Sequence, residues 1–445
     1  MVYNRYIGII FSMALILLIT GGCSEDSTPV NQENKLNFKI SVFSDPHYFA
    51  PELFAEGDAL ENNLRGSRKM LMESEAILKS AISRVKSINS QIVLIPGDLT
   101  KDGEKLSHQK FADNIRELKN SGKKVYVIPG NHDVANPESK SYIGVNVENV
   151  ESVTPAEFRQ IYADFGYNEA LYKDENSLSY VAEPIEGLWI IAMDACRYNE
   201  NTDRHTVGGK FNNATLNWIY DRIKEGKSKG KLMIGMNHHG VLEHFTGQKS
   251  NPVTTDYVID DYRSISEEFA KNGLNFVFTG HFHANDIVSA NYDKNFIYDI
   301  ETGSLVTYPV PIRTVEVINS EQMNISTELI DNVDYQSIGS DFQVYAYNYL
   351  KNDLSDFVED ILVSQFSLQE SVAAQFAPIG INAFVAHYAG DEVISKEAVD
   401  LINEYKGNNN ITIQLLSATI QTLYTDMNPE DNNLRINMMT GAVIR

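Results

Sequence analysis

The stretch Val125-Tyr126-Val127-Ile128-Pro129-Gly130-Asn131-His132-Asp133 joins an apolar run to a short polar island. Short apolar runs rich in β-branched and aromatic residues predict buried strands, so this island begins where a strand ends. Four other islands follow apolar runs in the same way: Ser44-Asp45-Pro46-His47, Pro96-Gly97-Asp98-Leu99, Asn237-His238-His239 and Gly280-His281-Phe282-His283. In layered α/β folds, ligands bind outside the carboxyl ends of the strands. We therefore expect the five islands to meet at one site.

The islands carry the side chains of a metal site. Aspartate, histidine and asparagine are ligands for hard-to-borderline metal ions, and glycine lets the backbone pass close to a ligand. Histidines scattered over a surface would not collect after predicted strands. Six of the chain's 10 histidines lie in the islands: His47, His132, His238, His239, His281 and His283. The pattern therefore predicts that the islands bind metal.

The islands, taken in order, resemble the signature of the calcineurin-like metallophosphoesterase superfamily. That signature reads D-x-H, G-D, G-N-H-[DE], a single His and G-H-x-H. This chain matches it with Asp45-x-His47, Gly97-Asp98, Gly130-Asn131-His132-Asp133, His238 and Gly280-His281-x-His283. The resemblance covers a predicted catalytic domain over residues 36–330 and implies an α/β fold, the αββα two-sheet sandwich. The alternation of strands and helices in this part is itself typical of βαβ units with parallel strands.

The resemblance implies a dinuclear metal centre. A single transition-metal ion takes about four to six ligands, whereas the islands supply more than that. The resemblance assigns Asp98 to both ions, because a carboxylate has two oxygens and can bridge. One ion would be bound by Asp45, His47, Asp98 and His283, and the other by Asp98, Asn131, His238 and His281. The mixture of imidazole and oxygen donors suits Mn, Fe, Zn or Ni and leaves the choice among them open.

The resemblance also implies a catalytic residue, His132, near the leaving group as general acid or transition-state stabiliser. Four further residues are candidates either for a hydrogen bond that orients a metal-binding side chain or for contact with the substrate. Asp133 either orients His132 or caps its loop, and His239 stands beside a ligand. His205 and Arg204 lie in a polar loop, where they either reach the substrate phosphate or form solvated surface charge. The two remaining histidines before residue 331, His108 and His244, are expected at the surface.

The implied reaction is hydrolysis of a phosphoester by a hydroxide that bridges two metal ions. The stretch from Gly97 to Glu104 is nearest to the cyclic-nucleotide phosphodiesterase-like branch, and Lys101 stands where a purple acid phosphatase would have a tyrosine ligand. Phosphodiesterase and phosphatase activity both stay open, on an exported small or lipid-derived phosphoester. The alternative is a non-catalytic or weakly active envelope lipoprotein that binds ligands on the same fold; loss of ligands would mark it.

The charge of the chain limits its partners. Its 445 residues carry a net charge of -23. Proteins that bind long nucleic acids rely on Lys and Arg contacts to phosphate, so no nucleic-acid partner is expected. A phosphoester substrate must be attracted locally, by metal rather than by the field of the whole protein. The sequence leaves the oligomeric state open.

The first 23 residues resemble a bacterial lipoprotein signal peptide. Arg5 supplies the positive charge, and Ile7 to Thr20 is too short for a transmembrane helix, which needs about 20 residues. Cys23 would carry the lipid and anchor the exported protein to the outer membrane, on its periplasmic or surface face. An ordinary secretory signal is the alternative. Residues 24–35 have the composition of a flexible tether.

Beyond Asp331, helical periodicity replaces strand alternation, so residues 331–445 are expected to form an acidic helical domain. Its one histidine, His387, lies in an apolar helical pattern and is expected to be packed rather than coordinating. Expected helices cover residues 342–362, 369–388, 396–405 and 411–423, with a capping box at Ser367 and Glu370 opening the second. In the catalytic domain, the spacing of apolar residues predicts a helix from about Arg68 to Ser87.

Overall fold

The computed structural model describes residues 35–336, 339, 341–365, 367–405, 407 and 410–445. The predicted signal peptide, Cys23 as the predicted site of lipid attachment, and the predicted tether up to residue 34 lie outside the described residues. Within the described ranges, no helix is both long enough and apolar enough to cross a membrane.

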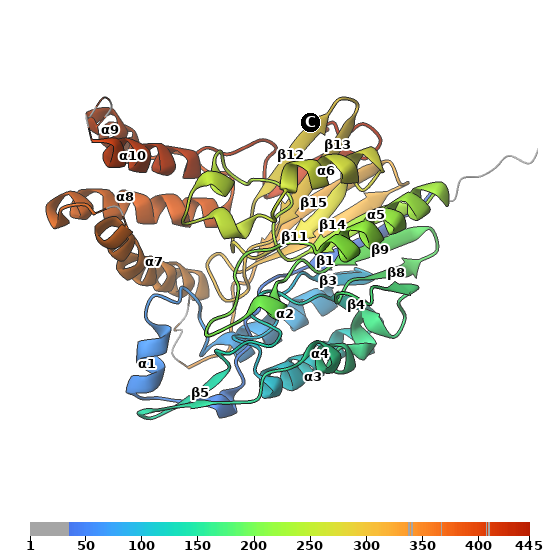
Figure 1. The fold of residues 1–445 in the computed structure, drawn as a ribbon, viewed down its shortest axis with the longest axis horizontal. Helices are drawn as coiled ribbons and strands as arrows, with labels where there is room; N and C mark the ends of the chain where they lie inside the picture. Colours follow the sequence, from blue (N-terminus) through green and yellow to red (C-terminus); the bar gives the residue numbers. More distant parts are fainter. Residues whose placement is uncertain (1–34, 337–338, 340, 366, 406, 408–409) are drawn as a thin grey trace, which may run out of the picture. The chain divides into compact units, whose positions relative to one another are not determined.

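Two sheets form the centre of the fold (Figure 1). The six-stranded sheet has the order β16-β15-β14-β1-β3-β4, and the seven-stranded sheet has the order β12-β13-β11-β10-β9-β8-β7. Strands β1, β3 and β4 are parallel, as are β9, β10, β11 and β13. The bounds in the first sheet are β1 (Phe38–Val42), β3 (Ile92–Ile95), β4 (Lys124–Val127), β14 (Pro311–Ile318), β15 (Gln322–Leu329) and β16 (Asn433–Asn437). Those in the second are β7 (Tyr172–Lys173), β8 (Tyr180–Ile185), β9 (Leu188–Met193), β10 (Leu232–Asn237), β11 (Phe276–Thr279), β12 (Ile287–Tyr292) and β13 (Asn295–Glu301).

Strand β9 shows how the sequence builds two apolar layers. Successive side chains of a strand point to opposite faces of its sheet. Ile190 and Ala192 pack into the core shared with the first sheet, whereas Trp189, Ile191 and Met193 pack into a second core with helices. Because both faces are covered, β9 is apolar throughout instead of alternating.

Helices cover the outer faces of the sheets. Apolar residues of α2 (Ser74–Ser87) and α3 (Lys105–Asn120) join the first core, and those of α5 (Asn213–Ser228) and α6 (Tyr262–Lys271) join the second. Helix α4 (Pro155–Ile161) begins with a complete capping box. The expected αββα sandwich is confirmed. Short elements complete this part: α1 (Asp58–Leu64) and a small sheet of β2 (Phe54–Ala55), β5 (Lys140–Ile143) and β6 (Asn146–Asn149).

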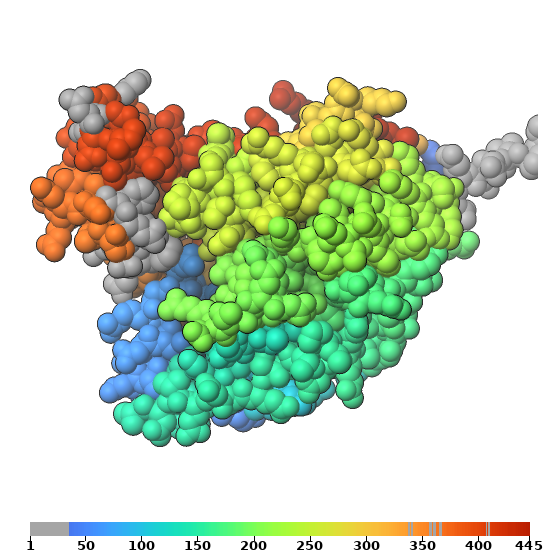
Figure 2. All heavy atoms as spheres, viewed as in Figure 1, coloured from blue at the N-terminus to red at the C-terminus, as the bar shows by residue number. Residues whose placement is uncertain are grey.

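The C-terminal segment contains four α-helices that pack on one another: α7 (Phe342–Asp360), α8 (Glu370–Ala389), α9 (Lys396–Tyr405) and α10 (Ile411–Leu423). In the space-filling view their orange and red residues gather at one end of the face shown (Figure 2). The chain is not helical to its end, because β16 pairs antiparallel with β15 at the edge of the first sheet. The division into two domains stays a prediction.

Two local expectations were wrong. The capping box at Ser367 is not formed, since Gln369 occupies the N-cap position of α8, without a side-chain capping bond, and Ser367 has a φ of 52°, outside the extended region of an N-cap. The helix expected from Arg68 begins only at Ser74. Met70 is buried by loop packing, where its backbone N–H donates to Val306 O at 2.8 Å, so its helix-like spacing has a tertiary cause.

Candidate active site

The ends of five strands deliver the predicted ligands to one place. Asp45 and His47 follow β1, Asp98 follows β3, Asn131 follows β4, and the remaining histidines follow β10 and β11. All seven side chains are at least nine-tenths buried. The structure thus brings together the ligands expected from the two halves of the sandwich: Asp45, His47, Asp98, Asn131, His238, His281 and His283.

The backbone of the site is strained. A positive φ is uncommon for residues other than glycine, and such conformations persist where the surrounding structure enforces them. Five of the predicted ligands have a positive φ: Asp45 (48°), His47 (35°), Asp98 (47°), His281 (79°) and His283 (70°). The strand ends turn sharply here, which directs successive side chains of one island to the same centre.

Two glycines of the islands are required by close approach. A Cβ atom on Gly130 would lie 2.1 Å from Asp98 Oδ1, and one on Gly280 would lie 2.3 Å from Asp45 Oδ2. Real Cβ atoms do not come this close to an oxygen. The glycines of the motif therefore make room for the two carboxylates.

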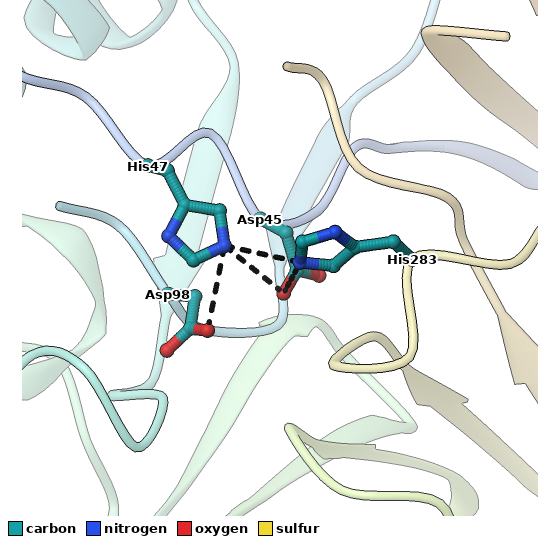
Figure 3. A group of neighbouring side chains, drawn as sticks. All are labelled: Asp45, His47, Asp98 and His283. Atoms are coloured by element: carbon teal, nitrogen blue, oxygen red, sulfur yellow. Dashed lines mark hydrogen bonds and ion pairs between the residues drawn. The ribbon is translucent and has the colours of Figure 1, made fainter. Parts of the chain in front are cut away.

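The first group of ligands is drawn in Figure 3. His47 Nε2 lies 3.1 Å from His283 Nε2, 3.5 Å from Asp98 Oδ2 and 3.9 Å from Asp45 Oδ1. His283 Nε2 lies 3.6 Å from the same Asp45 oxygen. Ligand atoms of the four residues lie within 4.8 Å of one another, which is the arrangement of donors around one metal ion.

The second group shares Asp98 with the first. Asp98 Oδ2 lies 3.4 Å from His238 Nε2, which in turn lies 3.1 Å from Asn131 Oδ1. His281 completes this group. One carboxylate thus stands between the two sets of donors, as a bridging ligand must.

Hydrogen bonds orient the imidazoles of the second group. His238 Nδ1 lies 2.8 Å from Pro96 O, and His281 Nε2 lies 3.3 Å from Asp256 O. A ring nitrogen that donates to a carbonyl leaves the other nitrogen with a lone pair, the form that binds metal.

The electrostatics of the site fit two cations. Burial lowers the pKa of His47, His281 and His283 well below the ordinary value, so these rings are neutral. Burial also raises the pKa of Asp45 to about 7. At Asp98 burial opposes ionisation, but His238 and His132 outweigh it and hold the carboxyl pKa below its usual range. His238 differs from the other three rings, because burial opposes its protonation but Asp98 outweighs burial and raises its pKa to about 9. The three neutral rings offer lone pairs directly, whereas His238 would release a proton on binding a metal ion.

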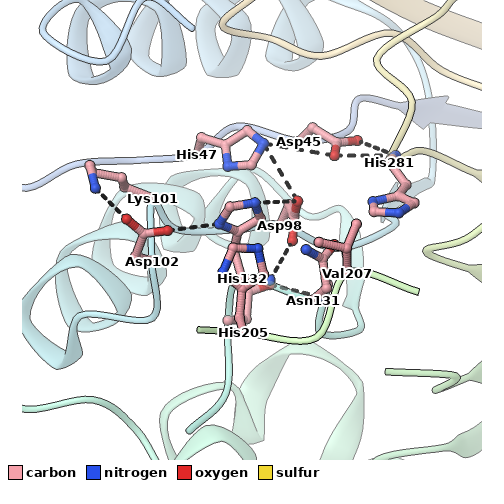
Figure 4. Close-up of polar contacts among 12 residues, drawn as sticks. Asp45, His47, Asp98, Lys101, Asp102, Asn131, His132, His205, Val207 and His281 are labelled. Carbon is pink, nitrogen blue, oxygen red and sulfur yellow. Dashed lines mark hydrogen bonds and ion pairs between the residues drawn. The ribbon is translucent and has the colours of Figure 1, made fainter. Parts of the chain in front are cut away.

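The proposed catalytic histidine, His132, is held by Asp102 (Figure 4). His132 Nδ1 lies 2.8 Å from Asp102 Oδ1, and Nε2 faces the ligands at 4.0 Å from Asp98 Oδ2. Burial raises the pKa of the Asp102 carboxyl, but contacts with Lys101 and His132 outweigh burial and hold the pKa below its usual range. An ionised Asp102 accepts a hydrogen bond from His132 Nδ1–H and so fixes the tautomer of the ring. The sequence did not indicate Asp102 for this position.

Asp133, which follows His132 in the sequence, bonds to the backbone of the islands. Its carboxylate accepts hydrogen bonds from the backbone N–H groups of Leu99 (3.0 Å), Thr100 (2.9 Å) and Gly130 (2.8 Å). These bonds join the islands that follow β3 and β4, so the geometry matches an Asp133 that caps the loop and not one that orients His132.

The other candidates are spread over the wall of the site. His205 Nδ1 lies 2.5 Å from Glu138 Oε2, and its ring centroid lies 4.2 Å from that of His132. His239 is buried and its Nε2 lies 2.8 Å from Val207 O, so it supports the loop that carries His205. Arg204 is exposed and does not line the cavity.

Two expectations about histidines were wrong. His108 is buried, with Nδ1 2.8 Å from Tyr162 Oη and Nε2 2.8 Å from Asp133 O. His244 is also buried, with Nδ1 2.8 Å from Asp286 Oδ1. Tertiary contacts that local sequence does not show cover both rings.

A cavity of about 340 Å³ opens above the ligands. Arg68 and Lys69 line this cavity, and sequence reasoning missed them because the apolar spacing predicts a helix that begins at about Arg68. Gly66 and Ser67 stand directly before these two residues, and a Gly-Ser pair is typical of a loop, so the sequence did contain a signal against the helix. Aromatic residues form another part of the wall: Tyr257, Phe282 and Tyr388.

Comparison with known proteins identifies the class. The family model of the calcineurin-like phosphoesterases matches residues 38–285, more than half of the chain. The protein belongs to the calcineurin-like phosphoesterase family. It is a metal-dependent phosphoester hydrolase, and the predicted resemblance is confirmed. No curated protein matches the chain.

Several solved structures are similar to the chain. A dimetal phosphatase from Danio rerio has a TM-score of 0.45 at 15% identity, over 66% of this chain and 96% of that one. A putative 5'-nucleotidase from Staphylococcus aureus, in complex with alpha-ketoglutarate, has a TM-score of 0.39 at 14% identity, over 73% and 59%. The purple acid phosphatase PPD1 of yellow lupin has a TM-score of 0.36 at 9% identity, over 66% and 52%.

Proposed function

We propose that the protein is an exported phosphoesterase that hydrolyses a small or lipid-derived phosphoester at two metal ions. The observation that carries this proposal is the complete set of seven donors in two groups that share Asp98. The His132–Asp102 pair beside them supports catalysis over the alternative of a ligand-binding lipoprotein. A binding module has no use for an oriented proton donor next to the ligands.

Two divalent or trivalent ions at these ligands would supply positive charge to the phosphoryl oxygens and activate the attacking water. The chain's own residues do the rest. The bond from His132 Nδ1 to Asp102 keeps Nε2 facing the cavity, where it can pass a proton to the leaving oxygen. Burial and the Lys69 ammonium lower the pKa of His132 to about 4. An anionic phosphoryl group beside the ring raises that pKa, so substrate binding favours the protonated form.

The test of the proposed function is metal content together with hydrolysis of simple substrates. We expect about two transition-metal ions per chain, since seven donors exceed one coordination sphere. Protein reconstituted with Mn, Fe, Zn or Ni should hydrolyse aryl phosphate monoesters or diesters. Elemental analysis and release of the aryl alcohol measure the two quantities. A stoichiometry that stays at zero or one, or a fully loaded protein without activity on either ester, would overturn the proposal.

We also propose that the protein is lipid-anchored through Cys23 to the outer membrane. The support is the predicted signal sequence with its apolar run and small residues before Cys23. A Cys23→Ser variant should lose fatty-acid labelling and leave the membrane fraction, or stay unprocessed. A lipoprotein carries more than one acyl chain, so wild-type anchoring should be stable. Equal labelling and fractionation of the two proteins would contradict the anchor.

The charge of the chain supports a small or lipid-derived substrate. A net charge of -23 disfavours a polyanionic nucleic acid. Activity that is specific to long single-stranded or double-stranded nucleic acid would contradict this part of the proposal.

A further inference from the structure

The loop of residues 66–70, here called the cationic loop, brings a lysine to the centre of the active site. Lys69 Nζ lies 3.4 Å from His47 Nδ1 and 3.5 Å from His132 Nε2. The ammonium therefore stands between a predicted metal ligand and the proposed proton donor, inside the cavity. Within the described part of the chain, Lys69 Nζ forms no ion pair with a carboxylate, and these two rings are its hydrogen-bond partners.

The cationic loop is held by helix α7 of the C-terminal segment. The Asp353 carboxylate accepts from the backbone N–H groups of Gly66, at 3.0 Å, and of Arg68, at 2.5 Å. Tyr349 Oη donates to Lys69 O at 3.0 Å. These bonds hold the backbone at Gly66, Arg68 and Lys69, which limits the directions open to the Lys69 side chain.

The segment between β13 and β14 also holds this loop. Thr307 Oγ1 donates to Arg68 O at 3.0 Å, and Met70 N donates to Val306 O at 2.8 Å. Arg68 has a positive φ of 61°, so the chain turns sharply between these anchors. The Arg68 guanidinium lies 3.2 Å from Tyr388 Oη at the aromatic part of the wall.

Lys69 is half-buried, and an ammonium that is partly withdrawn from water is stabilised by an anion at its side. The chain carries a net charge of -23, so a local cation adds to the attraction that the metals exert on a phosphoester. Charge-assisted hydrogen bonds to phosphate oxygens are short and strong. Lys69 Nζ lies 3.5 Å from His132 Nε2, so a phosphoryl group that reaches this ring also comes within reach of the ammonium.

We propose that the cationic loop is a phosphate-binding subsite in which Lys69 is a catalytic residue that binds a non-bridging oxygen of the reacting phosphoryl group. Asp353 is its positioning residue on α7. This inference rests on the proposed function for the identity of the substrate, but not for the binding of phosphate itself. It gives the C-terminal segment a role in catalysis, through the loop that α7 holds.

The test compares Lys69→Met, which removes the charge at nearly constant length, with Lys69→Arg, which keeps it. Exposed Lys79 on α2 supplies the matched control, Lys79→Met. We expect Lys69→Met to lower kcat/KM for an aryl phosphate by about 10- to 100-fold, the range of one charge-assisted hydrogen bond. Inhibition by inorganic phosphate should weaken by about tenfold or more, and both metal ions should stay bound. Lys69→Arg should recover part of the loss, and Lys79→Met should match the wild type.

The positioning role is tested with Asp353→Asn, which keeps the shape of the side chain but removes its charge and turns one of its two accepting oxygens into a donor. We expect a smaller loss of kcat/KM and weaker phosphate inhibition, with unchanged metal content. A merely structural change would lower thermal stability without moving the inhibition constant. If Lys69→Met fails to fold, Lys69→Gln, which also removes the charge, and Asp353→Asn still decide, because phosphate affinity unchanged in both would overturn the subsite.

Calorimetric titration of the metal-loaded protein with inorganic phosphate separates this inference from the proposed function. A protein without phosphoesterase activity whose phosphate affinity still depends on Lys69 would refute the function and keep the subsite. An active enzyme whose kcat/KM and phosphate affinity are unchanged by Lys69→Met would keep the function and overturn the subsite.

Discussion

Replacement of Asp98 by alanine should remove nearly all activity and weaken both metal ions. Asp98 is the one residue that belongs to both groups of ligands, with Oδ2 3.5 Å from His47 Nε2 and 3.4 Å from His238 Nε2. Metal ions contribute several kcal/mol of transition-state stabilisation, so loss of both should lower kcat/KM by about 10³-fold or more. Turnover of an aryl phosphate and elemental analysis of the purified variant measure the two effects.

The control for Asp98→Ala is Asp113→Ala, because the Asp113 side chain is 79% exposed. Asp113→Ala should keep both metal ions and full activity. Asp98→Asn, which keeps an oxygen donor but loses the charge, should fall between the wild type and Asp98→Ala in metal content. If Asp98→Ala retained two tightly bound ions, Asp98 would not be the bridge and the division of the ligands would be wrong.

Replacement of His132 by alanine should lower turnover by about 10²–10⁴, the range for one general acid–base group. The metal ions should remain, because the seven donors do not include His132. The loss should shrink for an aryl phosphate with a good leaving group, which departs without a proton. Steady-state kinetics on a series of leaving groups, together with metal analysis, measures both expectations.

The partner variant for His132→Ala is Asp102→Asn, which removes the charge that fixes the Nδ1 tautomer. Its loss of turnover should be smaller than that of His132→Ala and should follow the same dependence on the leaving group. The double variant should cost little more than His132→Ala, because Asp102 acts through the ring. Loss of metal from His132→Ala would assign the ring as a ligand instead.

Much of the fold was predictable because the local spacing of apolar residues indicates which residues are buried and whether they form a helix or a strand. The apolar runs before the islands became β1, β3, β4, β10 and β11. Helices α9 and α10 begin and end at the residues that the sequence predicted. The helix expected from Arg68 failed because loop packing can bury residues at helical spacing, and β16 was missed because its partner β15 lies about a hundred residues earlier in the sequence.

In the candidate site, too, some features follow from the sequence and others only from the tertiary structure. The sequence by itself determined which seven residues are the predicted ligands and in which order they occur, because they stand in short contiguous islands directly after apolar runs. Only the tertiary structure decided what surrounds them. Asp102 rather than Asp133 holds His132, Lys69 enters the cavity from a loop, and Asp353 secures that loop from helix α7. These contacts join segments between about 20 and 290 residues apart, and local periodicity cannot specify which distant groups meet.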